Sequence, residues 1–257
     1  MSWRLKNWQR DRILKHESLP PDLWQKVLAQ IKFLHGLSPD EIVRLQQNVI
    51  LFLHKKQISG AHDLTITDEM RVIIAVQACI LILELDLDYY DNWVEIIVYP
   101  GKFIIDYDYA DTDGIVHHAR QIVAGESWLA GPVILSWQDA AGFSTESGYN
   151  VVIHEFAHKL DMLHEGANGC PFLHANMSAQ AWREIFSKAY SNFCKQVTLG
   201  ETTIIDPYAA ESPAEFFAVL SEVFFTKPSI IKQHFPSVYE QLALFYRQDT
   251  ANRWANQ

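Results

Sequence analysis

Apolar residues recur at helical spacing through the first third of the chain. The segments 20–36 and 38–56 place them three or four positions apart, which is typical of amphipathic helices. Ser38 followed by Pro39 marks the start of the second helix, because serine caps a helix and proline fits its first position. Thr67 is expected to cap a third helix. That helix carries the apolar run 72–83, which is too short to span a bilayer and is typical of a buried helix.

The pattern changes in the middle of the chain. β-Branched and aromatic residues, interrupted by glycine and proline, predict short strands within 93–109, 114–123 and 131–137. Helical spacing returns after about residue 145. We expect helices over the segment around 150–162, near 178–197 and from 213, with one or two more to the end.

This order of elements predicts an α+β fold. A polar N-terminal arm over residues 1–20 precedes one domain at 21–257, which has a helical front (21–88), a sheet region (93–137) and a helical back (142–257). The strands are expected to lie beside the helix around 150–162 and to form the wall of a cleft.

The segment NVVIHEFAHKLDM, residues 150–162, carries the strongest chemical signal. His154 and His158 are four residues apart, so a helix presents both from one face, while Glu155 lies about 100° around it. This H-E-x-x-H spacing supplies two zinc ligands and a general base for a bound water. The alternative without metal chemistry is an amphipathic helix with two surface histidines. The apolar neighbours favour a zinc site, because unligated polar groups there would be costly.

A catalytic zinc needs a third protein ligand. His164 lies too far along the same helix to share the ion. Glu215 is the better candidate, with Glu211 as its competitor. Ser212 can cap a helix here, with Pro213 at its first position, so Glu215 also has the spacing of a capping box. The residues alone do not decide whether Glu215 binds the metal or only caps the helix.

Two of three further residues have both a chemical and a structural interpretation. Tyr208 is a candidate donor to the oxyanion of a tetrahedral intermediate, or a packed loop tyrosine. Asp161 either accepts the second ring N–H of His158 or faces solvent; we favour the latter. Cys170, a lone cysteine in NGCPF, is interpreted as structural.

Composition limits the class of partner and the compartment. The net charge of -10 argues against a dedicated nucleic-acid surface, which needs a basic face. The three cysteines form no CxxC and are odd in number, which favours a reducing compartment. The first residues lack the features of a signal peptide. We therefore expect a cytoplasmic protein without membrane attachment.

Four segments, HEFAHKLD, YAAESPAEFFAVLSEVFF, VHHARQIVAGESWLAGPVILSW and VEIIVYPGKFIID, together resemble the Mlc titration factor A family of bacterial zinc metallopeptidases. The likeness runs from about Pro20 to Tyr246. It implies a zincin-like fold with a gluzincin-like site, and a peptidase that cleaves small peptides as an aminopeptidase does. It also implies a partner, the glucose-responsive repressor Mlc, which the family draws off DNA.

The resemblance also implies site residues. It assigns His154, His158 and Glu215 as zinc ligands and adds His117, the first histidine of VHH, from the strand before the motif. His118 points to the other side of that strand. If His117 reaches the ion, it takes the position of the nucleophilic water and the resting enzyme is latent; if not, it lines the cleft.

Two main hypotheses follow. One is zinc-dependent hydrolysis of peptides with Glu155 as general base; the other is a regulatory protein that sequesters the repressor, with secondary peptidase activity. A scaffold with a closed, four-ligand zinc is a third option.

Overall fold

The computed structural model describes residues 3–110, 116–123, 125–127, 131–142 and 148–255. Within these ranges, the side chains of residues 3–6, 104–110, 116–123, 164–165 and 255 are outside the description. The α-helices are α1 (Trp3–His16), α2 (Pro21–Gln30), α3 (Pro39–Lys55), α4 (Asp68–Leu81), α5 (Trp137–Ala140), α6 (Val151–Glu165), α7 (Ala179–Thr198), α8 (Pro213–Thr226), α9 (Pro228–His234), α10 (Pro236–Tyr246) and α11 (Thr250–Ala255).

The strands are β1 (Gln57–Gly60), β2 (Glu95–Tyr99), β3 (Phe103–Ala110), β4 (Val116–Val123), β5 (Gly125–Ser127) and β6 (Val133–Ser136). Short 3-10 helices are η1 (Lys32–Leu34), η2 (Leu87–Tyr90) and η3 (Pro207–Ala210). The chain is mostly helical with a small mixed sheet, so the predicted α+β class is confirmed.

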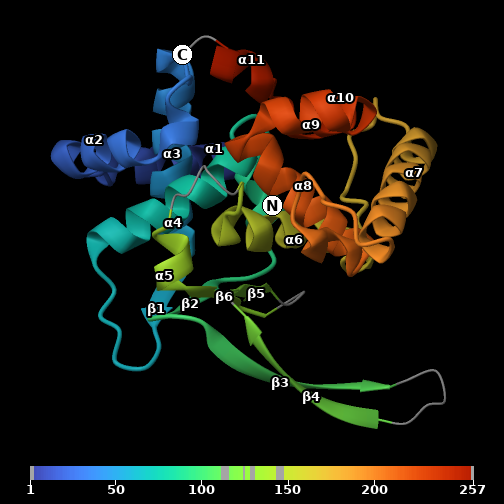
Figure 1. The fold of residues 1–257 in the computed structure, drawn as a ribbon. Coiled ribbons are helices and arrows are strands. Elements are labelled where there is room, and N and C mark those ends of the chain that lie inside the picture. The colour runs from blue at the N-terminus through green and yellow to red at the C-terminus, as the bar shows by residue number, and fades with distance from the viewer. Residues whose placement is uncertain (1–2, 111–115, 124, 128–130, 143–147, 256–257) are drawn as a thin grey trace.

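The sheet has the order β1-β2-β6-β5. β1, β2 and β6 are parallel, and β5 pairs antiparallel with β6 at the edge, with Glu126 opposite Ile134. β3 and β4 form a separate antiparallel ribbon that projects from the body of the molecule (Figure 1). The sequence pattern did not predict β1 or β5, since both are short and contain glycine and polar residues.

The predicted helix starts have a clear physical basis. Ser38 and Glu41 form a capping box, in which Ser38 Oγ accepts from Glu41 N and Glu41 Oε2 accepts from Ser38 N. Thr67 Oγ1 accepts from Met70 N at 3.2 Å and caps α4. The arm expected over residues 1–20 contains α1, and its Ile13 packs against the core.

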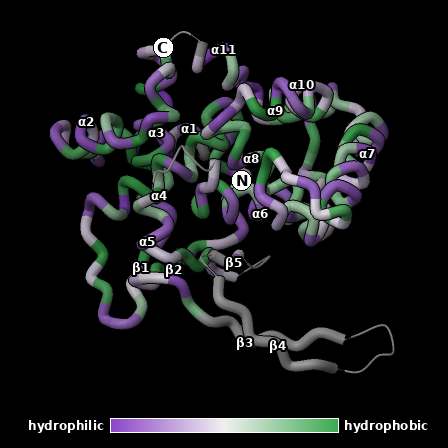
Figure 2. Tube along the Cα trace, viewed as in Figure 1, coloured by the Kyte–Doolittle hydropathy of each residue, from purple (hydrophilic) through white to green (hydrophobic). Residues whose placement is uncertain are grey.

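Almost all of the buried hydrophobic side chains that the structure describes form one cluster, which extends from Trp24 to Tyr246. α4 and α8 are buried over almost their whole length, and hydrophobic positions gather where the central helices meet (Figure 2). α6 lies between these two helices and the sheet (Figure 1). None of the helices described is both long and apolar enough to cross a membrane.

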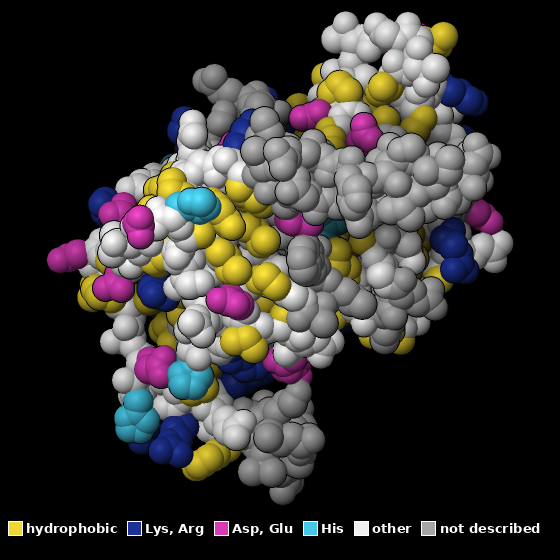
Figure 3. Space-filling model, turned by 90° about the horizontal axis from the view of Figure 1, so that it is seen from below, with side chains coloured by type: hydrophobic (Ala, Val, Ile, Leu, Met, Phe, Trp, Pro, Cys, Tyr) yellow, Lys and Arg dark blue, Asp and Glu magenta, His cyan; other side chains and the backbone are white. Residues whose placement is uncertain are grey.

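Charged side chains are spread over the face that Figure 3 shows. Lys and Arg side chains there lie apart from one another, with Asp, Glu and hydrophobic side chains between them. On the described part of this face, the basic groups do not join into one patch of the kind that phosphate backbones require.

A buried lysine makes the stability of the fold depend on pH. Lys56 Nζ donates to the carbonyls of Tyr90 and Trp93 and lies 3.8 Å from the centre of the Trp93 ring. Burial lowers its pKa to about 8, and nearby Lys55 and Lys159 also lower it, although Asp91 opposes the shift.

We expect Lys56→Met to destabilise the protein by ~1–3 kcal/mol, because two buried carbonyls lose their donor. Between pH 8 and 10.5 the unfolded chain binds the Lys56 proton more tightly than the folded chain, so wild-type stability gains from this group as pH rises. The deficit of the variant should therefore widen across this window. Urea unfolding of both proteins at several pH values measures it; a constant difference would contradict the prediction.

Candidate metal centre

α6 and α8 together supply a compact group of metal-ligating atoms. Asn150 Oδ1 accepts from Ile153 N at 2.9 Å and begins α6, which places His154 and His158 one turn apart on its first turns. Ser212 Oγ accepts from Glu215 N at 3.1 Å and begins α8 with Glu215 in its first turn. The structure thus brings His154, His158 and Glu215 together as a possible metal-binding group.

Three atoms of this group face one another. Glu215 Oε2 lies 2.9 Å from His154 Nε2 and 3.3 Å from His158 Nε2, and the two Nε2 atoms are 3.1 Å apart. Atoms at these separations can all lie about 2.0–2.2 Å from one ion, the usual range for zinc with histidine and carboxylate ligands.

The hydrogen bonds around His154 show why a cation suits this group. Its Nδ1 lies 2.7 Å from Glu222 Oε1 and donates to it, so the neutral ring presents a lone pair at Nε2. That lone pair faces the carboxylate of Glu215, which also only accepts. Glu215 Oε2 is buried without a hydrogen bond of normal geometry to any described residue. Two acceptors at this distance need a shared cation, which is a proton when the His154 ring is charged and a metal ion when the site is loaded.

The electrostatics point in the same direction. Burial alone would raise the pKa of Glu215, but the contacts with both histidines outweigh it and hold the pKa far below its usual range. Burial alone would lower the pKa of His154, but Glu215 and Glu222 raise it well above its usual value. The site therefore stabilises positive charge at the position where the three atoms meet.

Glu155 lies beside this group without belonging to it. It is 4% exposed, and its Oε2 has no hydrogen-bond partner among the described residues. Burial raises the pKa of Glu155, while His154, His158 and the Ser127 hydroxyl oppose the rise. A carboxylate with a raised pKa beside a metal group is well suited to exchange a proton near neutral pH.

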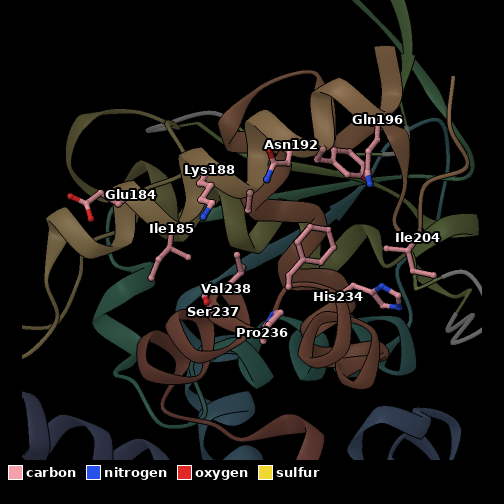
Figure 4. Close-up of a pocket in the computed structure, with 13 residues that line it drawn as sticks. Glu184, Ile185, Lys188, Asn192, Gln196, Ile204, His234, Pro236, Ser237 and Val238 are labelled. Carbon is pink, nitrogen blue, oxygen red and sulfur yellow. The ribbon is translucent and has the colours of Figure 1, made fainter. Parts of the chain in front are cut away.

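The group opens into a cleft of about 310 Å³. β5 forms one wall of the cleft, and η3 with the start of α8 forms the other. Strands were predicted to lie beside the α6 helix and to form a cleft wall. A strand does so, but it is β5, which the sequence pattern did not predict. The cleft is lined by Glu126, Ser127, His154, Glu155, His158, Met162, Ala167, Tyr208, Ser212, Ala214 and Glu215. A larger hollow of about 600 Å³ lies between α7 and the α9–α10 junction (Figure 4), but none of the metal-ligating side chains lines it.

The other residues singled out from the sequence are placed as follows. Tyr208 lines the cleft, 41% exposed, with its ring centre 6.1 Å from that of His154. Glu211 is exposed at the end of η3, outside the metal-ligating group. Cys170 is partly buried, forms no disulfide with the described residues and packs against the core. His117 pairs with Tyr109 in the β3–β4 ribbon, but its side chain is among those not described, as are those of His118 and His164.

Asp161 corrects an expectation. It does not face solvent, because it is only 2% exposed, and its Oδ2 accepts from Gly169 N at 2.7 Å. Asp161 therefore holds the loop that follows α6, and Trp182 Nε1 donates to the Gly169 carbonyl of the same loop. His158 Nδ1 has no hydrogen-bond partner among the described residues.

Two positions that contact the candidate site, Glu222 and Gly125, were not predicted from the sequence. Glu222 follows Glu215 by seven residues, two helical turns, so a search along the same helix face would have found it. Gly125 gives no such signal, since only the tertiary structure places it against Glu155.

Comparison with known proteins agrees with this geometry. The model of the family described as glucose-regulated metallo-peptidase M90 matches residues 5–247. The chain belongs to this family. Mlc titration factor A of Salmonella gallinarum is 37% identical over 249 residues, covering 96% of this chain and 92% of the relative. Mlc titration factor A of Salmonella choleraesuis is 36% identical over the same shares of both chains. An uncharacterized protein of Synechocystis is 37% identical over 250 residues, which are 95% of this chain and 90% of its own.

Membership of the M90 family makes this chain a metallopeptidase and implies a metal. The donor set of two histidines and one glutamate in a cleft fits that implication.

Gly125 provides a test of how Glu155 is held. A Cβ at this position would lie 2.5 Å from Glu155 Oε1, 2.7 Å from Glu155 Cγ and 2.7 Å from Val151 Cγ2. We expect Gly125→Ala to displace the Glu155 carboxylate and to reduce kcat/KM of peptide hydrolysis by up to ~10²-fold, since small misplacements near the reacting atoms have such costs. Metal content should stay normal. Full activity of the variant would show that Glu155 needs no such close packing.

Proposed function

We propose that this protein is a zinc-dependent peptidase of the aminopeptidase type. The observation that carries the proposal is the convergence of His154, His158 and Glu215 in one cleft with the buried carboxylate of Glu155 beside them. A His-His-Glu donor set with an open position is typical of catalytic zinc. When bound, zinc lowers the pKa of a coordinated water and polarises the substrate carbonyl.

The residues of the chain supply the remaining chemistry. Glu155 takes the proton of the attacking water and gives it to the leaving amine, which its burial beside the ligands supports. Tyr208, from the opposite wall, donates its hydroxyl to the oxyanion as the carbonyl becomes tetrahedral. His117 stays a candidate fourth ligand or substrate contact.

The charge of the cleft supports substrates with a free amino terminus. Three carboxylates line it, those of Glu126, Glu155 and Glu215, and no Lys or Arg is among its described lining residues. Glu126 Oε2 is buried and has no hydrogen-bond partner among the described residues. A substrate α-ammonium would supply the positive charge that such a carboxylate lacks.

The test uses the purified full-length protein. We expect about one zinc per chain by metal analysis, and hydrolysis of aminoacyl p-nitroanilides that a chelator abolishes and added zinc restores. N-acetylated forms of the same substrates should be cleaved poorly, because they lack the positive charge. Hydrolysis that survives complete removal of metal would refute the dependence on zinc, and absence of hydrolysis by the zinc-loaded protein would refute the peptidase proposal. Equal cleavage of blocked substrates would refute only the aminopeptidase part.

A second function is supported by the relatives that carry the name Mlc titration factor A. We propose that this chain also binds a transcriptional repressor of the Mlc type in the cytoplasm, a reducing compartment that suits three cysteines without a disulfide among the described residues. The Glu155→Gln variant distinguishes peptide hydrolysis from repressor binding. If repressor binding is the main role, the variant should lose hydrolysis and still bind purified repressor in co-sedimentation.

A further inference from the structure

Glu222 lies at the centre of a buried chain of polar contacts behind the metal-ligating group. It is 2% exposed and projects from α8 toward α6. One of its oxygens, Oε1, accepts from His154 Nδ1 at 2.7 Å. The other, Oε2, accepts from the backbone N–H of Asn150, the residue that caps α6. Both oxygens of one carboxylate are thus used by the helix that carries the two histidines.

The chain of contacts continues to a third helix. Asn150 Nδ2 donates to Gln77 Oε1 at 2.7 Å, and Gln77 Nε2 donates to the carbonyls of Ile73 and Ala140. Asn150 Oδ1 is already taken by the N–H of Ile153. Glu222 and Gln77 therefore contact Asn150 from two sides, and of these two residues it is Glu222 that also contacts a metal-ligating side chain.

From these contacts we propose that Glu222 is a positioning residue for the metal centre. It fixes the ring orientation of His154 with Nδ1 protonated and Nε2 directed at the ion, and it holds α6 and α8 in register so that the atoms of both helices meet. This inference rests on the proposed zinc site and adds the residue that prearranges it. Partners of this kind outside the ligand shell contribute ~10–100-fold to metal affinity.

The chemistry of the side chain explains why a carboxylate is needed. Two donors, His154 Nδ1–H and Asn150 N–H, point at Glu222. Glutamine has the same length but only one acceptor oxygen, so Glu222→Gln can satisfy one donor and must turn its NH2 group toward the other. Glu222→Met fills a similar volume and satisfies neither donor.

The experiment compares zinc affinities, using Zn²⁺ alone in competition with a chromophoric chelator. We expect Glu222→Gln and Glu222→Met to retain the helical circular dichroism signal and to bind zinc ~10–100-fold more weakly than wild type. Gln77→Met is the matched control, because it breaks the buried chain beyond Asn150 and leaves the Glu222–His154 contact intact. It should lower the melting temperature without a comparable loss of zinc affinity.

A spectroscopic signal makes the test independent of stability. In zinc-loaded wild type, the His154 Nδ1–H proton should give a downfield NMR resonance that is protected from exchange, and this resonance should be lost or shifted in Glu222→Met. Unchanged zinc affinity in both Glu222 variants would overturn the inference, as would equal losses of affinity in Gln77→Met. If the wild-type protein binds no zinc, the proposed function itself fails, which is a different result from wild-type binding that Glu222 does not affect.

Discussion

Hydrolysis by the Glu155→Gln variant should fall by ~10²–10⁴-fold, the usual cost of removing a general base. Glutamine keeps the size of the side chain but cannot take a proton from water. The substitution should affect proton transfer alone, because Glu155 does not belong to the group of three residues that could hold the metal. Zinc should therefore stay bound at the wild-type level. The measurement is kcat/KM on an aminoacyl p-nitroanilide together with the zinc content of the same sample.

The control is Glu184→Gln, which removes one carboxylate from the exposed side of α7, outside the cleft. It should leave both turnover and zinc content unchanged. Near-normal turnover in Glu155→Gln would remove Glu155 from the mechanism, and loss of zinc from this variant would make it a ligand instead.

The Glu215→Gln variant distinguishes the two possible roles of Glu215, helix cap and metal ligand, because each role predicts a different effect on zinc binding. The chain contains a capping box for comparison, in which Glu41 Oε2 accepts from the N–H of Ser38 at 2.8 Å. At the start of α8, Ser212 caps in the same way, but Glu215 Oε2 lies 2.9 Å from His154 Nε2. A residue that only caps would tolerate glutamine at a cost below about 1 kcal/mol.

We expect instead that Glu215→Gln loses zinc affinity by more than the ~10–100-fold typical of partners outside the ligand shell. A neutral amide replaces the anionic oxygen on which the two histidines converge. Glu211→Gln is the paired control, four residues earlier and exposed, and it should bind zinc normally. Competition with a chromophoric chelator gives both affinities. Loss of zinc in the Glu211 variant with retention in the Glu215 variant would reverse the assignment.

The sequence predicted the helical part of the fold well because its signals are local. Helix starts at Ser38, Thr67 and Ser212 depend on a hydroxyl that reaches an N–H three residues on, and all three form as expected. The strands β1 and β5 were missed because each has only three or four residues and is stabilised by its neighbours in the sheet. Short strands are defined by pairing rather than by their own pattern.

The same division applies to the candidate site. The sequence by itself determined that His154 and His158 share one helix face with Glu155 beside them, because helix geometry fixes the directions of residues one turn apart. It also supplied Glu215 as a candidate, without deciding between ligand and cap.

Only the tertiary structure decided which atoms meet. The packing of α8 on α6 turns Glu215 toward the histidines and places Glu222 behind His154, across 68 residues of chain. The sheet edge brings Gly125 against Glu155, and the loop after α6 buries Asp161. These contacts join residues far apart in sequence, and their formation depends on how whole helices pack rather than on any local pattern.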